Sequence, residues 1–299
     1  MGTTRLSVVI PTHNRATDLR ECLTAVVGQV DFDQDEVLVA DDSSTDGTPS
    51  VLADFPQVRV VSVPGSGSGS STARNAALGT ASGTLVLFID DDIVVTPDLV
   101  AKHMLFHEQF PLVEEALGGP VLWDPRKRIT RHMRWLETGG PLFAFDTIGD
   151  HGEVPPEHFC TANVSVKREL LSRVSGPFDE RLRRFTDVEL ASRLDAVGMR
   201  LQHDPSAEVW HLRSDTPRTT AERMREVGRA SVELERVAPD LVPPHAPMTP
   251  LRRCKAAVAT ALSPIAEIAP QFLAERIWAS RAAWAFSVGR RDAQLERES

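Results

Sequence analysis

Four short apolar runs recur in the N-terminal third of the chain, and helix-like segments separate them. The runs cover Leu6–Ile10, Glu36–Ala40, Val58–Val63 and Leu85–Ile89. Between the first two, Asp18–Val27 carries its apolar residues at helical spacing. Alternating strands and helices are typical of a mostly parallel sheet that is covered by helices. The sequence therefore predicts an α/β fold.

The overall length fits one large domain or one domain with an appendage. The chain has 299 residues, of which 41% are hydrophobic, so it can bury a substantial core. A helix-like segment at 220–236 is followed by a proline-rich stretch at 239–250. We interpret this stretch as the edge of the main domain and expect a domain over 1–215 and a helical C-terminal extension over 216–299.

Cysteine usage and hydropathy indicate the cellular compartment. The three cysteines, Cys22, Cys160 and Cys254, are far apart and form no CxxC pair, which argues against a disulfide framework and a zinc site. No run of uncharged apolar residues is long enough to span a membrane. We expect a cytoplasmic protein, either free or in peripheral contact with the inner face of the membrane.

The charge of the chain is unevenly distributed. Residues 1–216 contain 20 Lys and Arg against 32 Asp and Glu, whereas 217–299 contain 13 against 10. A nucleic-acid partner is not expected, because a duplex binder needs a basic face. Residues 251–291 combine seven basic residues with several aromatic side chains. This segment could lie on a membrane surface, or pack on the main domain or on a second copy in a homo-oligomer.

An acidic triplet, Asp90, Asp91 and Asp92, directly follows the fourth apolar run. Ligands of open α/β sheets bind at the carboxyl ends of the strands. If the strand continued, Asp90 and Asp92 would share one side and Asp91 would point away. Carboxylate oxygens suit Mg²⁺ or Mn²⁺. The alternative is a hydrated acidic turn.

Polar residues also follow the first and second runs. They are Pro11, Thr12, His13, Asn14 and Arg15 after the first run, and Asp41, Asp42, Ser43 and Ser44 after the second. Together with the acidic triplet, these clusters are expected to meet in one crevice. A polyanionic ligand would enter so acidic a site only with a divalent cation. The Gly- and Ser-rich segment 64–72 is either a ligand-closing loop or a flexible linker.

Four stretches of the chain occur in a characteristic order. They read VVIPTHNR, VLVADDSSTDGT, ARNAALGTASGTLVLFIDDD and FTDVELASRL. This succession resembles the family 2 glycosyltransferases over residues 5–215. The resemblance implies a GT-A fold, a Rossmann-like sheet flanked by helices, for the nucleotide-sugar-binding and catalytic domain. It also implies inverting transfer of a sugar from a nucleoside-diphosphate sugar, with uridine the expected base, to a hydroxyl acceptor.

The resemblance assigns donor-binding roles residue by residue. The positions are Pro11, Thr12, His13, Arg15, Asp42, Arg74, Asn75, Asp90 and Asp91. His13 would lie against the nucleobase and Asp42 would accept a hydrogen bond from it. Asp92, together with Asp90, would hold the Mn²⁺ or Mg²⁺ cofactor. His211 would either complete the metal shell or be structural.

The catalytic base implied by the resemblance is Asp187. The family commonly has Glu at the preceding position, where this chain has Thr186. An inverting transfer needs a base that deprotonates the acceptor hydroxyl as it attacks the anomeric carbon. The alternative is that Asp187 is a capping residue or a surface residue of the helix that begins here.

Further segments are less specific. Cys160–Asn163 and Gly176–Glu180 resemble family segments near the acceptor. In the variable middle of the chain, a sugar-stacking or phosphate-holding role and a surface role are both open. The residues concerned are Trp123, Arg126, Arg128, Arg131 and Trp135. The acceptor is a saccharide, a lipid-linked saccharide or a metabolite.

Two other functions fit part of the sequence. The run FIDDDIV also reads as the DxDxV motif of haloacid-dehalogenase-type phosphatases, in which Asp90 would be the nucleophile and Asp92 an acid. In that fold, however, the motif ends the first strand, whereas here it ends about the fourth. A non-catalytic nucleotide-sugar-binding scaffold is the third possibility, favoured if Thr186 reflects loss of the base site.

Overall fold

The computed structural model describes residues 5–63, 65, 67–141, 148, 152–242 and 249–298. The chain divides into two compact units, Met1–Asp124 with Ile148–Arg213, and Pro125–Thr147 with Ser214–Ser299. The expected division into a domain over 1–215 and a helical extension over 216–299 remains a prediction.

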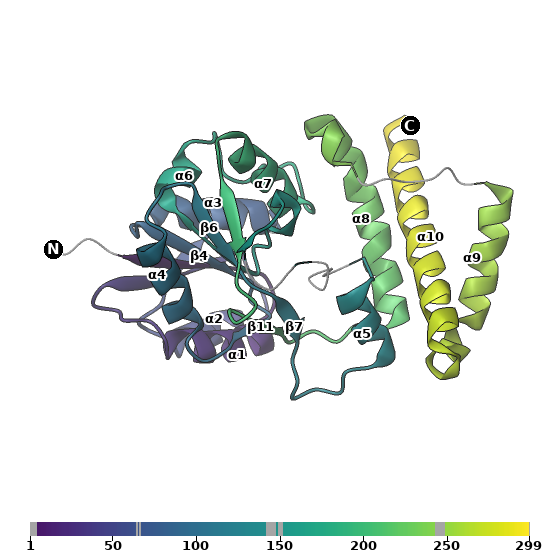
Figure 1. Ribbon diagram of the computed structural model, residues 1–299, viewed down its shortest axis with the longest axis horizontal. Coiled ribbons are helices and arrows are strands. Elements are labelled where there is room, and N and C mark those ends of the chain that lie inside the picture. The colour runs from purple at the N-terminus through teal and green to yellow at the C-terminus, as the bar shows by residue number, and fades with distance from the viewer. Residues whose placement is uncertain are drawn as a thin grey trace. The chain divides into compact units, whose positions relative to one another are not determined.

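Among the described residues of the first unit, eight strands form one sheet in the order β3-β2-β1-β4-β9-β6-β10-β8 (Figure 1). Their bounds are β1 Leu6–Thr12, β2 Asp35–Asp41, β3 Arg59–Ser62, β4 Leu85–Ile89, β6 Glu115–Gly118, β8 Gly152–Glu153, β9 Asn163–Lys167 and β10 Arg200–His203. β1 to β4 pair in parallel, whereas β9 runs antiparallel to both β4 and β6. A second sheet has the order β5-β11-β7, with β5 Ile93–Val95, β7 Val121–Trp123 and β11 Val209–His211.

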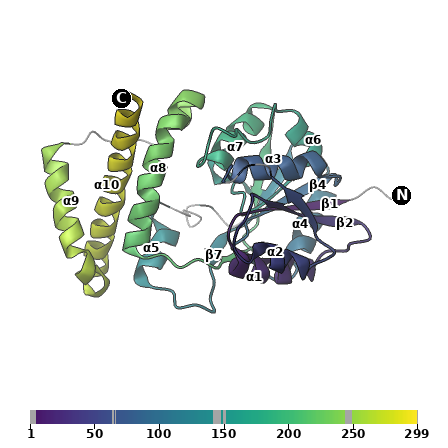
Figure 2. The ribbon, with the colours of Figure 1, turned by 180° about the vertical axis from the view of Figure 1, so that it is seen from behind.

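Helices cover both faces of the large sheet. α3, α6 and α7 lie on one face, and α1 and α2 lie on the other (Figures 1 and 2). Their bounds are α1 Ala16–Val27, α2 Thr48–Ala53, α3 Ser70–Thr80, α6 Arg168–Ser172 and α7 Thr186–Ala196. α4 (Leu99–Gln109) follows β5, and a short 3₁₀ helix, η2, spans Pro156–His158. The predicted α/β fold is confirmed.

The apolar runs form strands because they are buried on both faces. Every residue of β1 and β4 is buried, so both strands need apolar side chains at consecutive positions. The third run is the exception: β3 lies at the end of the sheet and most of its residues are exposed. α4 begins at Leu99, directly after Asp98, which has a left-handed backbone (φ 64°).

The second unit is helical. Its helices are α5 Arg131–Thr138, α8 Pro217–Val237, η3 Pro239–Leu241, α9 Pro250–Leu262, η4 Ser263–Ile268 and α10 Gln271–Glu298. α8 and α10 pack side by side at a close crossing. A Cβ atom on Gly289 would lie 1.8 Å from the carbonyl oxygen of Arg225, and one on Gly228 would lie 2.0 Å from that of Phe286. Only glycine allows the two backbones to approach so closely.

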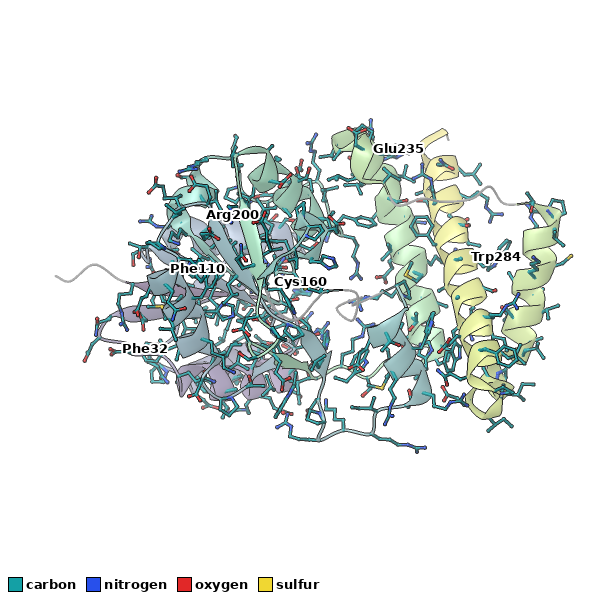
Figure 3. The ribbon with its side chains drawn as sticks, viewed as in Figure 1. Phe32, Phe110, Cys160, Arg200, Glu235 and Trp284 are labelled. Atoms are coloured by element: carbon teal, nitrogen blue, oxygen red, sulfur yellow. The ribbon has the colours of Figure 1, made fainter. Side chains whose placement is uncertain are left out.

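Aromatic rings fill the interior of the second unit. The ring centroid of Trp278 lies 4.9 Å from that of His132 and 5.7 Å from that of Trp135. Trp135 is therefore a core residue, and neither role suggested for it from the sequence is correct. An ion pair between Glu235 of α8, labelled in Figure 3, and Arg290 of α10 adds a polar contact. In the described chain, no helix combines the length and apolarity needed to cross a membrane.

Candidate active site

Three polar segments meet at the carboxyl ends of β1, β2 and β4. β1 lies between the other two strands in the sheet. The backbone N–H of Asp42 donates to the carbonyl oxygen of Thr12 (2.9 Å), and the Thr12 hydroxyl donates to the carboxylate of Asp91 (2.7 Å). The clusters identified in the sequence thus lie at one edge of the sheet, where ligands bind in open α/β folds.

The three aspartates after β4 have different partners. β4 ends at Ile89, so the triplet lies in a turn and the alternation of a strand does not apply to it. Asp90 accepts from Arg74 (2.5 Å), Asp91 from Thr12, and Asp92 from Arg15 (3.1 Å). Burial and, secondly, the charge of Asp92 raise the pKa of Asp91 to about 7.

Asp92 is buried and faces His211. The distance between its Oδ1 atom and His211 Nε2 is 3.8 Å, while Arg15 contacts Oδ2. A carboxylate oxygen and an imidazole nitrogen are a donor pair that suits Mn²⁺. Over the described parts of the chain, no three His, Cys, Asp or Glu side chains are grouped to hold a metal ion. The pair therefore fits a metal site in which the ligand and water supply the remaining oxygens.

The protonation of His211 follows from its hydrogen bond. The backbone N–H of Arg213 donates to Nδ1 (3.1 Å), so Nδ1 is unprotonated and the proton of a neutral ring is on Nε2. The ring also packs against buried Trp123, with the centroids 5.8 Å apart. Coordination of a cation through Nε2 would require that proton to move to Nδ1, with loss of the Arg213 bond.

His13 is oriented by hydrogen bonds at both ring nitrogens. Nδ1 donates to the carbonyl oxygen of Asp42 (2.7 Å), and Nε2 accepts from the amide of Asn14 (3.0 Å). The ring is half-buried, and Pro11 beside it is buried in β1. With the edge of the ring occupied, a ring face is the part that could contact a nucleobase.

The Asp42 carboxylate binds the Gly-rich loop. It accepts hydrogen bonds from the backbone N–H groups of Ser68 (3.0 Å) and Gly69 (2.8 Å). Arg183 donates to the carbonyl oxygen of Gly67, which fixes the loop from its other side. The loop ends earlier than we expected, because α3 begins at Ser70; Pro64 and Ser66 lie outside the described residues. A contact between Asp42 and a base remains a prediction.

Arg74 is a buried cation at the centre of the site. Its guanidinium bonds Asp90 and lies over the Phe178 ring, 5.4 Å from the centroid. Only 4% of the residue is exposed, and its Nε has no hydrogen-bond partner among the described residues. Phe178, which the sequence suggested only as part of the segment near the acceptor, thus supports a charged residue of the site.

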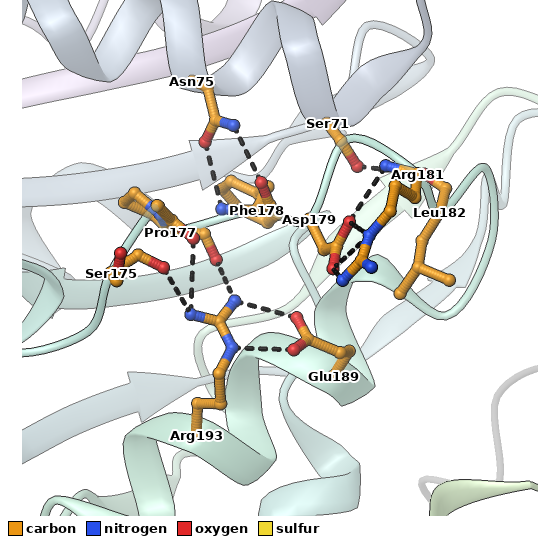
Figure 4. Close-up of polar contacts among 11 residues, drawn as sticks. Ser71, Asn75, Ser175, Pro177, Phe178, Asp179, Arg181, Leu182, Glu189 and Arg193 are labelled. Atoms are coloured by element: carbon orange, nitrogen blue, oxygen red, sulfur yellow. Dashed lines mark hydrogen bonds and ion pairs between the residues drawn. The ribbon is translucent and has the colours of Figure 1, made fainter. Parts of the chain in front are cut away.

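Asn75 ties α3 to the segment before α7 (Figure 4). Its amide donates to the Phe178 carbonyl oxygen (2.8 Å) and to Glu180 (2.9 Å), and it accepts from the Phe178 N–H (3.0 Å). The Arg193 guanidinium binds Glu189 and carbonyl oxygens of residues 175–177 in the same view. The expected contact between Asn75 and the donor remains a prediction, since its side chain is engaged in positioning this segment.

Asp187 is the second residue of α7. Phe185, which precedes the helix, has a left-handed backbone (φ 63°), a strained conformation for a bulky residue that is often found at functional sites. The half-buried carboxylate of Asp187 accepts the N–H of Val188 (3.0 Å). Burial raises its pKa and the charge of Arg74 opposes the rise. Asp187 is therefore close enough to the Arg74–Asp90 pair to interact with it electrostatically.

A buried polar network supports β9 and was not predicted from the sequence. Lys167 donates to Nδ1 of His107 (3.0 Å), and Nε2 of His107 is 2.9 Å from the Ser165 hydroxyl. The same hydroxyl is 2.8 Å from Nδ1 of His103, whose Nε2 is 3.1 Å from the side-chain oxygen of Asn163. Lys has only donors, so each proton position along this chain of bonds is determined. The spacing of four residues between the two histidines was the available signal.

Comparison with known proteins identifies several relatives in sequence. Residues 7–165 match the family described as glycosyl transferase family 2. The chain is 30% identical to validoxylamine A glucosyltransferase of Streptomyces hygroscopicus subsp. jinggangensis, over 72% of this chain and 56% of that protein. It is 39% identical to the uncharacterized glycosyltransferase YfnE of Bacillus subtilis, over 67% of this chain and 63% of that protein. The chain thus spans a little more than half the length of the relatives it matches.

Solved structures resemble the whole chain. The mannosyltransferase PcManGT from Pyrobaculum calidifontis, in complex with GDP-Man and Mn²⁺, has a TM-score of 0.59 at 22% identity. That match covers 100% of this chain and 80% of the other. S. aureus TarS 1–349 in complex with UDP-GlcNAc has a TM-score of 0.57 at 16% identity, over 98% and 92%. At these identities the likeness shows a shared fold.

Proposed function

The chain belongs to glycosyl transferase family 2 and has the GT-A fold, and on that premise we propose that it transfers a sugar from a nucleoside-diphosphate sugar to a hydroxyl acceptor with inversion. The observation that carries this proposal is the meeting of Asp187, Arg74 and Asp90 beside the strand ends that present Thr12, Asp42 and Asp92. This arrangement can hold an anionic donor on one side and a base on the other.

We assign the general base to Asp187. A base must be unprotonated at neutral pH yet basic enough to accept a proton from an attacking hydroxyl. Burial raises the pKa of Asp187 while the charge of Arg74 opposes the rise, and a raised pKa makes a carboxylate a stronger base. The proton leaves the acceptor oxygen for Asp187 as that oxygen bonds to the anomeric carbon and the bond from that carbon to the diphosphate breaks.

Metal dependence is part of the proposal. Asp92 and His211 would hold Mn²⁺ or Mg²⁺, with Asp90 in the surrounding shell, and the cation would neutralise charge on the departing diphosphate. Support comes from the facing Asp92 and His211 side chains and from the Mn²⁺ in the PcManGT complex. Arg15, which contacts Asp92, would add a positive charge beside the diphosphate.

The donor is proposed to be a uridine nucleotide sugar. TarS is bound to UDP and to UDP-GlcNAc, whereas PcManGT is bound to GDP-Man, so guanosine is the main alternative. A panel of nucleotide sugars screened by metal-dependent thermal shift distinguishes the two, because a bound ligand raises the unfolding temperature. The acceptor class, a saccharide, a lipid-linked saccharide or a metabolite, is identified by screening acceptors with the donor found in this way.

The decisive experiment replaces Asp187 with Asn. We expect turnover to fall by at least ~10²-fold while donor affinity stays nearly unchanged, since the base acts on the acceptor. Asp195→Asn, the same chemical change at an exposed position of α7, is the control and should retain activity. Near-normal turnover of Asp187→Asn would exclude it as the base.

The same assays separate the alternatives. A scaffold would bind the sugar nucleotide and release no nucleoside diphosphate with any acceptor. A haloacid-dehalogenase-type phosphatase is not favoured, because the family membership is that of glycosyltransferases and the DDD turn follows the fourth strand of the chain. It would release phosphate from phosphate esters, and Asp90→Asn would abolish that release.

A further inference from the structure

Large apolar side chains are exposed along α9, η4 and the start of α10. Ile268 is 85% exposed, Leu251 and Phe272 are each 66% exposed, and Val258 and Ile265 are at least half exposed. We call these five residues the α9–η4 surface. Leu251 and Val258 are seven residues apart, which places them on one side of α9.

The opposite side of this segment is lined by small residues. α9 and η4 pack against α10, and the residues they bury are Ala256, Ala259, Ser263 and Ala266. A helix that is held to a protein core normally turns its large apolar residues inward. Here the large residues point outward, so packing within the unit does not account for them.

The backbone that carries Ile268 is fixed. The guanidinium of Arg131 donates to the carbonyl oxygens of Glu267 (2.6 Å) and Ala269 (2.9 Å), on either side of Ile268. It also bonds the side chain of Gln271 at the start of α10. The backbone on both sides of the most exposed apolar residue of the surface is therefore held by hydrogen bonds. This residue does not belong to a frayed end.

Basic residues accompany the apolar ones. Between residues 250 and 272, which include the whole α9–η4 surface, the sequence contains three basic residues, Arg252, Arg253 and Lys255, and one acidic residue, Glu267, although the chain as a whole has a net charge of −9. Arg253 and Lys255 are exposed. Exposed apolar side chains beside a cluster of cations are the features of a segment that lies in the interface of an anionic membrane.

We propose that the α9–η4 surface docks on an anionic lipid bilayer, an interaction that goes beyond the sugar transfer proposed above. The apolar side chains would enter the boundary between headgroups and acyl chains while the exposed Arg253 and Lys255 contact lipid phosphates. A second copy of the chain fits less well. A symmetric dimer through this surface would bring two cationic clusters together, because an isologous interface pairs each patch with itself.

Vesicle flotation with the full chain tests the proposal. We expect binding to vesicles of phosphatidylcholine mixed with phosphatidylglycerol and little binding to phosphatidylcholine alone. Each basic residue near an anionic surface strengthens binding roughly fivefold, so neutralising all three to Gln should weaken binding about 10²-fold. Ile268→Ser with Phe272→Ser should also abolish flotation. Leu112→Ser, at a 58% exposed leucine of the first unit, is the control and should float like the unaltered chain.

A label at Cys254 reports the docking directly. Cys254 is exposed and adjoins the basic residues, whereas Cys22 is buried and burial raises the pKa of Cys160 to about 12, so a thiol-directed fluorophore reacts at Cys254. Its emission should shift to the blue with anionic vesicles only. Circular dichroism confirms that the variants are folded.

Two results would overturn the proposal. One is equal flotation of the Ile268→Ser, Phe272→Ser variant and the unaltered chain on anionic vesicles. The other is a concentration-dependent dimer, detected by sedimentation, that these substitutions dissociate while vesicles bind no protein. Near-normal turnover of Asp187→Asn would exclude the proposed base and leave the flotation result untouched, whereas loss of flotation on substitution of Ile268 and Phe272 does not bear on the base, so the two proposals fail independently.

Discussion

Replacing Ser165 with Ala tests the buried network that links α4 to β9. The Ser165 hydroxyl accepts a hydrogen bond from Nε2 of His107 and donates one to Nδ1 of His103, and all three side chains are buried. Alanine at this position leaves one donor and one acceptor without partners. An unpaired buried polar group costs about 1–3 kcal/mol, so we expect a loss of roughly 2–6 kcal/mol in the free energy of unfolding.

Urea unfolding at neutral pH measures this loss, and hydrogen exchange localises it to α4 and β9. Ser172→Ala, which removes an exposed hydroxyl that bonds only the Glu169 carbonyl oxygen, is the control and should change stability by less than about 0.5 kcal/mol. If Ser165→Ala were as mild as this control, the account of the network would be wrong.

The histidines of the network also predict how stability depends on pH. Burial lowers the pKa of His103 to about 4 and that of His107 to about 3, whereas an unfolded histidine has a pKa of about 6.5. The unfolded chain therefore binds more protons below pH 6.5. The stabilisation is fully present above that pH and is lost as the pH falls toward the folded-state values, by on the order of 2 kcal/mol per histidine at pH 5. Unfolding in urea at pH 7 and pH 5 checks the sign.

Two further substitutions have clear outcomes. Gly289→Ala should destabilise the C-terminal unit by about 1–3 kcal/mol, because the Cβ of the new alanine would collide with the carbonyl oxygen of Arg225. Thermal unfolding measures this loss. The control is Gly79→Ala, at a helical glycine with open space around it, and this substitution should be neutral or stabilising. Asp42→Asn replaces one of the two acceptors of the Gly-rich loop by a donor. Hydrogen exchange of the Ser68 and Gly69 amides should then become faster, and binding of the sugar nucleotide should weaken. Unchanged exchange would contradict this role for Asp42.

The sequence predicted the sheet best where strands are covered on both sides. β1, β2 and β4 each contain a run of consecutive apolar residues, so both their existence and the polar segments after them could be located. β9 was missed because it is short and runs antiparallel between strands that are distant in sequence. Its buried Ser165 also breaks the apolar pattern, and its partners on α4 are set by tertiary packing.

The contacts within the candidate site were less predictable than its location. The sequence placed the aspartates at a strand end, but it could not show that Asp90 pairs with Arg74 or that Asp42 binds loop amides. These contacts join residues 16 and 26 positions apart in the chain and depend on how α3 packs. For Trp135 the sequence left a ligand-binding role and a surface role open, whereas its side chain is buried in the core of the second unit.

We propose that a divalent cation held through Asp92 helps to bind the nucleotide donor. Isothermal titration of uridine diphosphate into the protein, with and without Mn²⁺, measures this directly. We expect Mn²⁺ to strengthen binding to the unaltered chain, and we expect Asp92→Asn to reduce this strengthening by at least ~10-fold. Affinity that does not respond to Mn²⁺, or an Asp92→Asn variant that responds like the unaltered chain, would contradict it.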